Sequence, residues 1–413
     1  MIISNKSQPR MDDIPRPSVA ARVRLTKPYD PVSSLQAIKH NRHLDHYKLD
    51  WNESTIAPSP KVFEALRRFL DGDSRIQWYP DLCHDELYRN VSEYAGCRTE
   101  QIMFANGSDD ALAMTCQTYL NPGDGVVAPF PTYTHFLQFA ELAGAGLRLV
   151  RKDDPFSVSL QDIGAAIDGR TKMVYLANPN NPTGTLFPPV EIAGLAGRHP
   201  HVLFLVDEAY YEFSGCSCAA MIRSLPNIMV TRSFSKCFGL AGLRIGYVVA
   251  PEEIIGNLRR VHNPKSINKM AQVAAAAALD DLDYYRNYVA GVKRSAAMTR
   301  RFCDDHGIVC RLSHANFVLI GLENPGGVAA RLREVGVHVR DRSSQLPGMI
   351  RLTLGTPEQM REVLSRLGNV LDECHPVRLA SCAQCPAPAD APMVEDRPCP
   401  DPAGVMVKAA LRL

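Results

Sequence analysis

The segment "SFSKCFGLAGLRIGY", residues 233–247, places groups with chemical potential close together in the chain. Lys236 is preceded by Ser233 and Ser235 and followed eight residues later by Arg244. A lysine does covalent chemistry when it meets a carbonyl group in surroundings that lower the pKa of its amine. One guanidinium and two hydroxyls are suited to bind a phosphate group. A lone lysine is usually an ordinary surface residue, but these neighbours favour a reactive one.

A second phosphate-binding feature lies upstream, in "FANGSDDAL". Gly107, Ser108 and Asp109 stand where a predicted strand gives way to a predicted helix. The free N–H groups at the start of a helix bind phosphate well. Two such features with a lysine between them predict a phosphorylated aldehyde as cofactor, and pyridoxal phosphate has both groups.

Pyridoxal phosphate also needs a carboxylate for its ring nitrogen, donors for its phenolic oxygen and a cover for its face. "VLFLVDEAYYEF" supplies Asp207 after an apolar strand, with Tyr210 three residues on. "NPNNPTGT" supplies Asn181 in a turn, and "PFPTYTHF" supplies Tyr133. Taken singly, Asp207 could be a helix cap, Asn181 part of a plain turn and Tyr133 a core aromatic. Together they follow predicted strands, where open α/β sheets bind their ligands.

The elements that must position these residues follow from the hydrophobic pattern. Between about residues 60 and 290, helical patterns alternate with short apolar runs, several of them apolar throughout, as strands covered on both faces are. The runs are "QIMFAN", "GVVAP", "LRLVR", "KMVYLANP", "VLFLVDEAYY", "NIMVTRSF" and "RIGYVVA". We therefore predict a largely parallel sheet.

The chain divides into four predicted parts. Residues 1–45 form a proline-punctuated arm, and residues 46–290 form the large domain that binds the cofactor. Residues 291–375 combine long helical patterns with short strands and form a smaller α+β domain. Residues 376–413, rich in proline, alanine and cysteine, are predicted to be disordered.

Composition limits the partners. The 413 residues carry 46 Lys and Arg against 44 Asp and Glu, a formal net charge of +2. This balance predicts neither a nucleic-acid nor a membrane partner. No apolar run approaches the ~18 residues that a membrane helix needs, and no leader-like block opens the chain, so we expect a cytoplasmic protein.

The twelve cysteines predict packing rather than metal binding. Six lie singly in apolar or helical stretches, where a reduced thiol packs as a small apolar side chain. These are Cys83, Cys97, Cys116, Cys237, Cys303 and Cys310. Cys382 and Cys385 form a CxxC pair in the tail without the further ligands that a zinc site requires, so no metal is expected.

Three segments carry a resemblance to a known family. "NPNNPTGT", "VDEAYYEF" and "SFSKCFGLAGLRIGY", in this order and spacing, resemble the fold-type I class I/II aminotransferases, from about residue 28 to residue 371. Within that group, "KPYDP", "WYPD", "NGSDDAL", "SHANFVLI" and "IRLTLGTPEQ" are similar to segments of the histidinol-phosphate aminotransferases. The resemblance implies an α/β fold. It has a large domain with a mostly parallel seven-stranded sheet covered by helices, and a smaller α+β C-terminal domain.

The resemblance also implies a role for each site residue. Lys236 would form the Schiff base and move the proton, Asp207 would pair with the ring nitrogen, Asn181 and Tyr210 would donate to the phenolic oxygen, and Tyr133 would stack on the ring. The phosphate would be held by Ser108, Asp109, Ser233, Ser235 and Arg244, with Tyr79 reaching across from a second subunit. That last role implies a homodimer with shared sites.

At the far end of the substrate pocket the resemblance implies Arg351 in "IRLTLG" and Arg340 in "VHVRDRSS", with Tyr29 of the arm closing over them. Lys265 stands where these enzymes commonly carry a tyrosine. Alone, Arg340 and Lys265 would be solvated surface charges. Around one end of a substrate, the three cations would suit a doubly charged phosphate or phosphonate.

One wall of the pocket departs from the family pattern. "LDWNESTIAPSP" keeps Asn52 and Glu53 but lacks the usual first proline and glycine, so the wall of the substrate pocket is expected to differ. Asn52 is nevertheless expected to contact substrate.

The sequence thus predicts an aminotransferase that moves an amino group from a donor with an anionic tail to a 2-oxo acid such as 2-oxoglutarate. Histidinol phosphate is the leading donor, followed by a phosphorylated amino acid. Two related alternatives share every cofactor motif: a decarboxylase of phosphorylated amino acids, and a specialised-metabolism aminotransferase. A non-catalytic binding protein would need an appended DNA-binding module, and neither the arm nor the tail has the length and periodicity of one.

Overall fold

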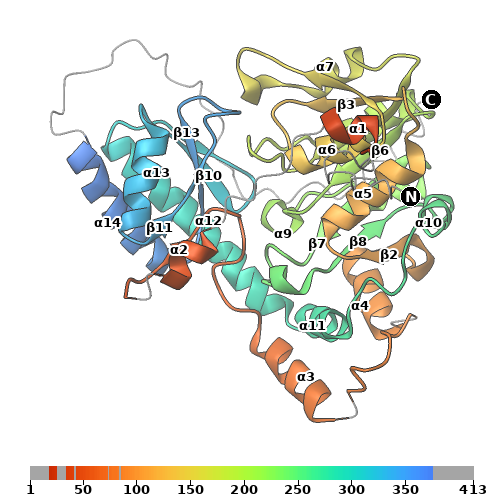
Figure 1. Ribbon diagram of the computed structural model, residues 1–413, viewed down its shortest axis with the longest axis horizontal. Coiled ribbons are helices and arrows are strands. Elements are labelled where there is room, and N and C mark those ends of the chain that lie inside the picture. The colour runs from red at the N-terminus through yellow and green to blue at the C-terminus, as the bar shows by residue number, and fades with distance from the viewer. Residues whose placement is uncertain (1–17, 26–33, 41–42, 73, 83–84, 375–413) are drawn as a thin grey trace, which may run out of the picture.

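The computed structural model describes residues 18–25, 34–40, 43–72, 74–82 and 85–374, which form two lobes (Figure 1). The larger lobe, on the right in Figure 1, holds a seven-stranded sheet between helices, and the smaller lobe holds a four-stranded sheet. The 24-residue helix α12, Leu282–Asp305, belongs to the run of chain that joins the two sheets. The predicted tail, residues 376–413, lies outside the described residues.

The large sheet has the strand order β2-β8-β7-β6-β5-β3-β4. Only β8 runs opposite to the other strands, because it pairs antiparallel with both β2 and β7. This confirms the predicted mostly parallel seven-stranded sheet, and its strands are the seven apolar runs of the sequence. They are β2 Ile102–Ala105, β3 Gly125–Pro129, β4 Gly146–Val150, β5 Thr171–Ala177, β6 Leu203–Asp207, β7 Ile228–Ser233 and β8 Gly246–Val249.

Both faces of this sheet are covered, which explains why its strands are apolar throughout. Successive strand residues alternate between two buried clusters, so that Met103 packs in one and Phe104 in the other. One face packs on α5 Ser108–Tyr119, α6 Thr134–Leu142 and α10 Glu252–Leu258. Helices that contribute to the other cluster are α3 Pro60–Asp71, α4 Asp85–Ala95, α7 Leu160–Ala165, α8 Pro189–Arg198, α9 Tyr211–Ser214 and α11 Lys269–Leu279.

The small lobe is built on an antiparallel sheet in the order β12-β13-β10-β9. Its strands are β9 Cys310–Leu312, β10 Phe317–Gly321, β12 Arg340–Asp341 and β13 Met349–Thr353, and its helices are α13 Pro325–Glu334 and α14 Pro357–Cys374. A separate parallel pair joins β1, Tyr47–Lys48, to β11, Val337–His338. The predicted α+β character of this part is therefore confirmed, while the domain boundaries at residues 45, 290 and 375 stay a prediction.

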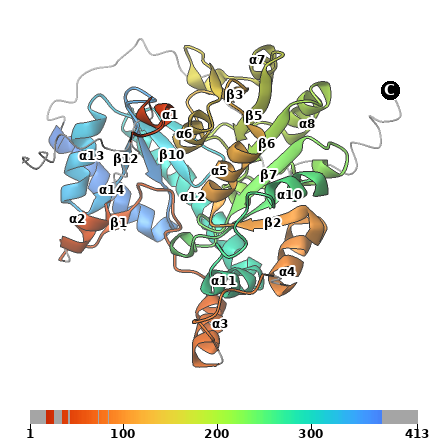
Figure 2. The ribbon, with the colours of Figure 1, turned by 45° about the vertical axis from the view of Figure 1, so that its right-hand side comes forward.

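The arm contains two short helices within its described part. α1, Ala21–Leu25, lies against α6 of the large lobe. α2, Leu35–His40, lies beside the small lobe in both Figure 1 and Figure 2. Over the part of the chain that the structure describes, no helix is long and apolar enough to span a membrane.

The two lobes meet closely at Gly184. The backbone N–H of His314 donates to the Gly184 carbonyl oxygen at 3.2 Å. Gly184 has a φ of 74°, and a Cβ atom placed on it would lie 2.1 Å from the Cβ of Ser313. Only glycine fits here, because the position requires both a left-handed backbone and an absent side chain.

We therefore predict that Gly184→Ala is more destabilising than Gly215→Ala. Gly215 shares the left-handed backbone, with φ 69°, but a Cβ there meets nothing within 4 Å. Both substitutions should cost about 1–3 kcal/mol in backbone strain. Gly184→Ala alone must also displace Ser313, which should add about 1–3 kcal/mol.

Urea unfolding of the two variants measures the difference. Equal unfolding free energies would show that the lobes do not approach each other as closely as the structure indicates.

Candidate active site

Three adjacent strands deliver polar side chains to one edge of the large sheet. β5, β6 and β7 run parallel side by side, so their carboxyl ends lie together. Asp207 is the last residue of β6, and Asn181 follows the end of β5 by four residues. Ser233 ends β7, and Lys236 follows it by three. The strand topology therefore places these side chains at the edge where open α/β sheets bind ligands.

Asp207 is a buried carboxylate held by hydroxyl groups. Its Oδ2 accepts a hydrogen bond from the Tyr175 hydroxyl at 3.2 Å, and its Oδ1 accepts one from the Thr231 hydroxyl at 3.0 Å. Burial raises the pKa of Asp207 to about 6, although the bond from Thr231 lowers it in part. A buried carboxylate with neutral donors attracts a cation strongly, so this position suits a protonated ring nitrogen.

Tyr210 forms the centre of a second group. Its hydroxyl oxygen accepts hydrogen bonds from the side-chain amides of Asn52, at 2.9 Å, and Asn181, at 3.4 Å. The Thr353 hydroxyl donates to Asn52 Oδ1 at 2.9 Å and fixes that amide. Because the Tyr210 oxygen accepts these bonds, its own proton stays available to donate to an oxygen of a ligand.

An anion-binding arrangement lies where α5 begins. Arg244 Nη1 donates to Ser235 Oγ, and Arg244 Nη2 donates to Asp109 Oδ2, both at 3.4 Å. A Cβ on Gly107, which precedes α5, would lie 2.6 Å from Arg244 Nη2. The absence of a side chain at Gly107 therefore lets the guanidinium approach the helix start at Ser108. Both features favour a phosphate at this point.

The remaining predicted phosphate and ring ligands have defined partners. The Tyr133 hydroxyl donates to Asp109 Oδ1 at 2.8 Å, which ties Tyr133 to the start of α5. Ser233 Oγ accepts the backbone N–H of Ser235 at 3.1 Å and shapes the loop that leads to Lys236. Both residues thus lie within the same group of contacts as Arg244.

Lys236 is partly buried and donates from Nζ to the carbonyl oxygen of Trp51 at 3.0 Å. Trp51 directly precedes Asn52, which contacts Tyr210. The segment around Trp51 therefore faces the end of Lys236, and it comes from the altered "LDWNEST" stretch.

Arg351 connects the small lobe to this edge. Its side chain is 5 % exposed, its Nη1 donates to Asn181 Oδ1 at 2.7 Å, and its Nη2 donates to the Asp50 carbonyl at 2.7 Å. Arg340 lies directly opposite Arg351 in the antiparallel pair of β12 and β13. Residues opposite each other in such a pair project on the same face with Cβ atoms ~5 Å apart.

Two predicted residues lie at the surface of this chain. Tyr79 is 76 % exposed, and the ammonium group of Lys265 lies 4.7 Å from the centre of its ring. Lys265 is itself exposed, so in this chain it contacts Tyr79 and its predicted place beside Arg351 stays a prediction. Tyr29 lies outside the described residues.

Sequence reasoning missed three residues of the site. Thr231 faces Asp207 across β6 and β7, and Tyr175 reaches it from β5. Both belong to strand patterns that would have identified them only if the strand register had been known. Trp51 contributes a backbone carbonyl, an atom that every residue type supplies, so only its unusual neighbours marked the segment.

Comparisons with known proteins show the family to which the chain belongs. Residues 45–367 match the family model described as aminotransferase class I and II. A histidinol-phosphate aminotransferase of Geobacillus sp. (strain WCH70) is 34% identical over 366 residues, covering 86% of this chain and 98% of that protein. A protein of Campylobacter jejuni named dihydroxyacetone phosphate transaminase is 35% identical over 326 residues, covering 78% and 89%.

The fold is also that of a solved relative. The crystal structure of histidinol-phosphate aminotransferase from Sinorhizobium meliloti, in complex with pyridoxal-5'-phosphate, matches with a TM-score of 0.78 at 24% identity. The match covers 86% of this chain and 98% of that one.

We predict that Asp207→Asn stabilises the chain when no ligand is bound. The pKa of Asp207 is about 6, against an ordinary value of 3.8, so ionisation opposes folding. The penalty for ionising Asp207 appears as pH rises from 3.8 to about 6 and is complete above that range. At pH 7 the amide should therefore raise the free energy of unfolding by up to about 3 kcal/mol.

Urea unfolding from pH 3.5 to pH 8 measures this effect. The gain of Asp207→Asn over the parent chain should shrink toward the acidic end. A gain that does not change with pH would contradict the buried carboxylate.

Proposed function

The chain belongs to the class I and II aminotransferases, and from this we propose a specific reaction. The protein binds pyridoxal phosphate and transfers an amino group from a donor with a phosphate-type tail to a 2-oxo acid such as 2-oxoglutarate. The observation that carries the choice of donor is the pairing of Arg340 with Arg351 across β12 and β13.

The residues at the sheet edge fit the cofactor. Asp207 would hold the ring nitrogen, because its buried carboxylate accepts hydrogen bonds from two neutral hydroxyls, and neither of them balances its negative charge. Arg244, Ser235 and the start of α5 would hold the phosphate. Tyr210, with Asn181 beside it, would donate to the phenolic oxygen, and Tyr133 would cover the ring.

When bound, the cofactor supplies an electron-accepting ring next to the substrate carbon that loses a proton. Lys236 would hold the aldehyde group of the cofactor in the absence of a donor. Once released, its Nζ would act as the base that removes the proton from the substrate carbon and delivers it to the carbon that receives the amino group. The Trp51 carbonyl gives that amine a defined resting position. Asp207 would keep the ring nitrogen protonated by its charge, which would be an electrostatic contribution to lowering the barrier.

Arg351 and Arg340 would hold the far end of the donor. Like charges directly opposite each other in a sheet are unfavourable, so an anion between two guanidinium groups is favoured. Arg351 also donates to Asn181, which contacts Tyr210, so the anion end and the reacting end share one hydrogen-bonded chain. A dianionic phosphate satisfies two arginines better than a single carboxylate does.

The Campylobacter relative supports a second candidate. Its name refers to dihydroxyacetone phosphate, and it is 35% identical to this chain, against 34% for the Geobacillus histidinol-phosphate aminotransferase. Amination of that ketone gives serinol phosphate, in which the amine-bearing carbon is one methylene away from the phosphate ester. Histidinol phosphate has the same arrangement. Both donors therefore need the same anion-binding end of the pocket. They differ only in the third substituent on the amine-bearing carbon.

We predict that phosphorylated donors are preferred and that the preference depends on Arg340. Steady-state kcat/KM should be compared for histidinol phosphate, serinol phosphate, phosphoserine, phosphothreonine, aspartate and phenylalanine. Arg340→Met should lower kcat/KM for the phosphorylated donors by about 100-fold, because it removes one of the two cations proposed to bind the phosphate. The matched control is Arg333→Met, an exposed arginine of α13.

Carbon dioxide release should be assayed with the two phosphoamino acids, since this separates decarboxylation from amino transfer. A preference for phenylalanine, or an equal loss with all donors in Arg340→Met, would contradict the assignment of the anion-binding end.

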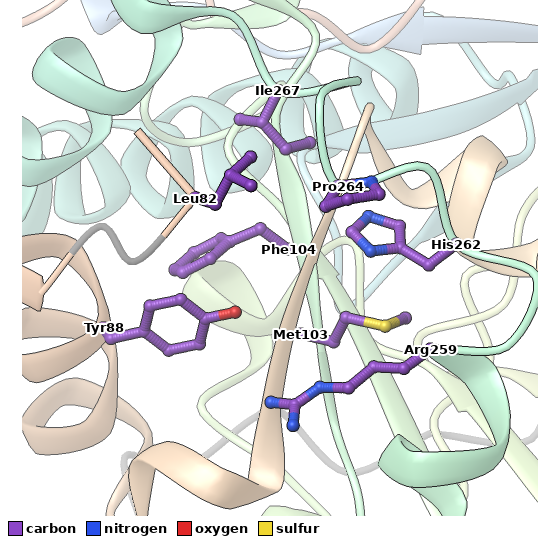
Figure 3. Close-up of a pocket in the computed structure, with 8 residues that line it drawn as sticks. All are labelled: Leu82, Tyr88, Met103, Phe104, Arg259, His262, Pro264 and Ile267. Atoms are coloured by element: carbon purple, nitrogen blue, oxygen red, sulfur yellow. The ribbon is translucent and has the colours of Figure 1, made fainter. Parts of the chain in front are cut away.

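The protein is further proposed to act as a homodimer with shared sites. Trp78, Tyr79 and Leu82 are all more than half exposed, which is unusual for three large apolar side chains within five residues. Beside them lies a cavity of about 290 Å³ whose walls include Leu82, Tyr88 and Phe104 (Figure 3). A second copy of the chain is the occupant that the family resemblance implies, with Tyr79 reaching the partner's phosphate site.

Subunit mixing tests the shared site. We predict that Lys236→Ala and Tyr79→Ala are each inactive and that their mixture recovers activity. Half of the dimers would be hybrids with one intact site of two, so about a quarter of the activity should return.

The matched control mixes Lys236→Ala with Asp207→Asn, because both residues belong to the same chain's site and no hybrid restores one. Proven subunit exchange without recovery in the first mixture would mean that one chain builds each site.

A further inference from the structure

We propose that a buried ion pair between Arg232 and Glu208 is a positioning element for the cofactor site. The proposal deepens the proposed function and rests on it. Arg232 lies in β7, one residue before Ser233 and four before Lys236. Glu208 directly follows Asp207 at the end of β6. The pair therefore joins the two chain segments that carry most of the proposed cofactor contacts.

The ion pair is fully enclosed and well bonded. Arg232 Nε lies 3.0 Å from Glu208 Oε2, and the two side chains are 2 % and 0 % exposed. Glu208 Oε1 accepts the backbone N–H of Cys218 at 2.6 Å. The Ser217 hydroxyl donates to Glu208 Oε2 and accepts from Arg232 Nη2, both at 2.7 Å. Three independent bonds thus fix the position of the carboxylate.

Arg232 also fixes the segment that bears Tyr210. The guanidinium carbon of Arg232 lies 3.5 Å from the centre of the Tyr211 ring, a stacked cation–π contact. Glu208 and Tyr211 stand on either side of Tyr210 in the sequence. The same guanidinium therefore holds both flanks of the residue proposed to bind the phenolic oxygen.

A second carboxylate extends the cluster toward Lys236. Glu212 Oε1 accepts a hydrogen bond from the Tyr94 hydroxyl at 3.0 Å, while Oε2 has no hydrogen-bond partner among the described residues. Burial raises the pKa of Glu212 to about 7, and the charge of Arg232 opposes part of this rise. Burial, and then the nearby Glu212, raise the pKa of the buried Cys237 thiol as well, and Cys237 directly follows Lys236. Tyr94 also meets the Phe238 ring edge to face, with ring centres 6.0 Å apart, and Phe238 lies two residues after Lys236, so the cluster contacts the lysine segment.

Its effect on stability does not explain why the chain contains this buried ion pair. A buried ion pair is often no more stabilising than apolar side chains of similar volume, because removing two charges from water is unfavourable. The pair does, however, specify one geometry, since the planar guanidinium bonds in fixed directions. A role in placing Asp207, Tyr210 and Lys236 relative to one another accounts for its presence at this point.

The experiment separates position from stability. Arg232→Met alone leaves Glu208 buried without its partner and should lower the urea midpoint of unfolding. The double variant Arg232→Met with Glu208→Leu removes both charges and should regain a midpoint near that of the parent chain. If the pair positions the site, the double variant should still bind pyridoxal phosphate more weakly. It should also lose about 100-fold in kcat/KM and shift the pH midpoint of the bound-cofactor absorbance.

Glu208→Gln is a milder variant that keeps the shape of the side chain, and it should weaken cofactor binding in the same direction. The matched control is Arg148→Met with Asp168→Leu, a partly exposed ion pair of the outermost strand β4 with an N–O distance of 2.6 Å. That control should leave cofactor affinity and the absorbance midpoint unchanged.

A stable double variant with the parent's cofactor affinity and absorbance midpoint would overturn the positioning role. Failure of the parent chain itself to bind pyridoxal phosphate would instead overturn the proposed function, so the two failures are distinguishable.

Discussion

The burial of one carboxylate at the end of β6 is the constraint on which the site depends. Asp207 is 5 % exposed and receives hydrogen bonds from Tyr175 and Thr231, hydroxyls of the two neighbouring strands. A charge in this position is weakly screened, so it costs stability when alone and binds a cation strongly when one arrives. The parallel register of β5, β6 and β7 creates this environment. Thr231 lies directly opposite Asp207, and Tyr175, two residues further back on β5, reaches it with its hydroxyl. The sheet therefore determines the electrostatics of the site before any loop contributes.

The small lobe completes what the sheet begins. Asn52, beside β1, and Arg351, in β13, reach Tyr210 and Asn181 respectively. These contacts require close approach of the lobes, which the bare backbone of Gly184 permits. The large sheet thus supplies charges in fixed positions, and the small lobe supplies groups whose positions depend on how the two lobes meet.

The sequence predicted this fold through patterns that are long enough to read. Seven apolar runs became the seven strands, because burial on both faces leaves a continuous apolar signal. The two-residue strands β1, β11 and β12 were missed, since two residues define no period. Polar residues after strands, such as Asp207 and Asn181, were recognisable by type and place. Thr231 was not recognisable, because its place beside Asp207 follows from strand register. The carbonyl of Trp51 was not recognisable either, because every residue type supplies the same backbone atom.

The separation of the two lobes also bears on substrate choice. The proposed cofactor contacts of Asp207 and Arg244 belong to the large sheet and its connecting loops, whereas Arg340 and Arg351 lie on a different sheet, opposite each other in β12 and β13. A substitution in the small lobe can thus alter the shape or charge of the donor end without moving the carboxylate behind the ring. Relatives that are about one-third identical to this chain bear names that refer to two different phosphorylated compounds. Such a difference in names is expected if the two arginines proposed to bind phosphate set a common charge requirement and other residues of the pocket select the rest of the donor. The segment around Trp51, whose carbonyl oxygen accepts a hydrogen bond from Lys236, is where the sequence of this chain departs from the family pattern.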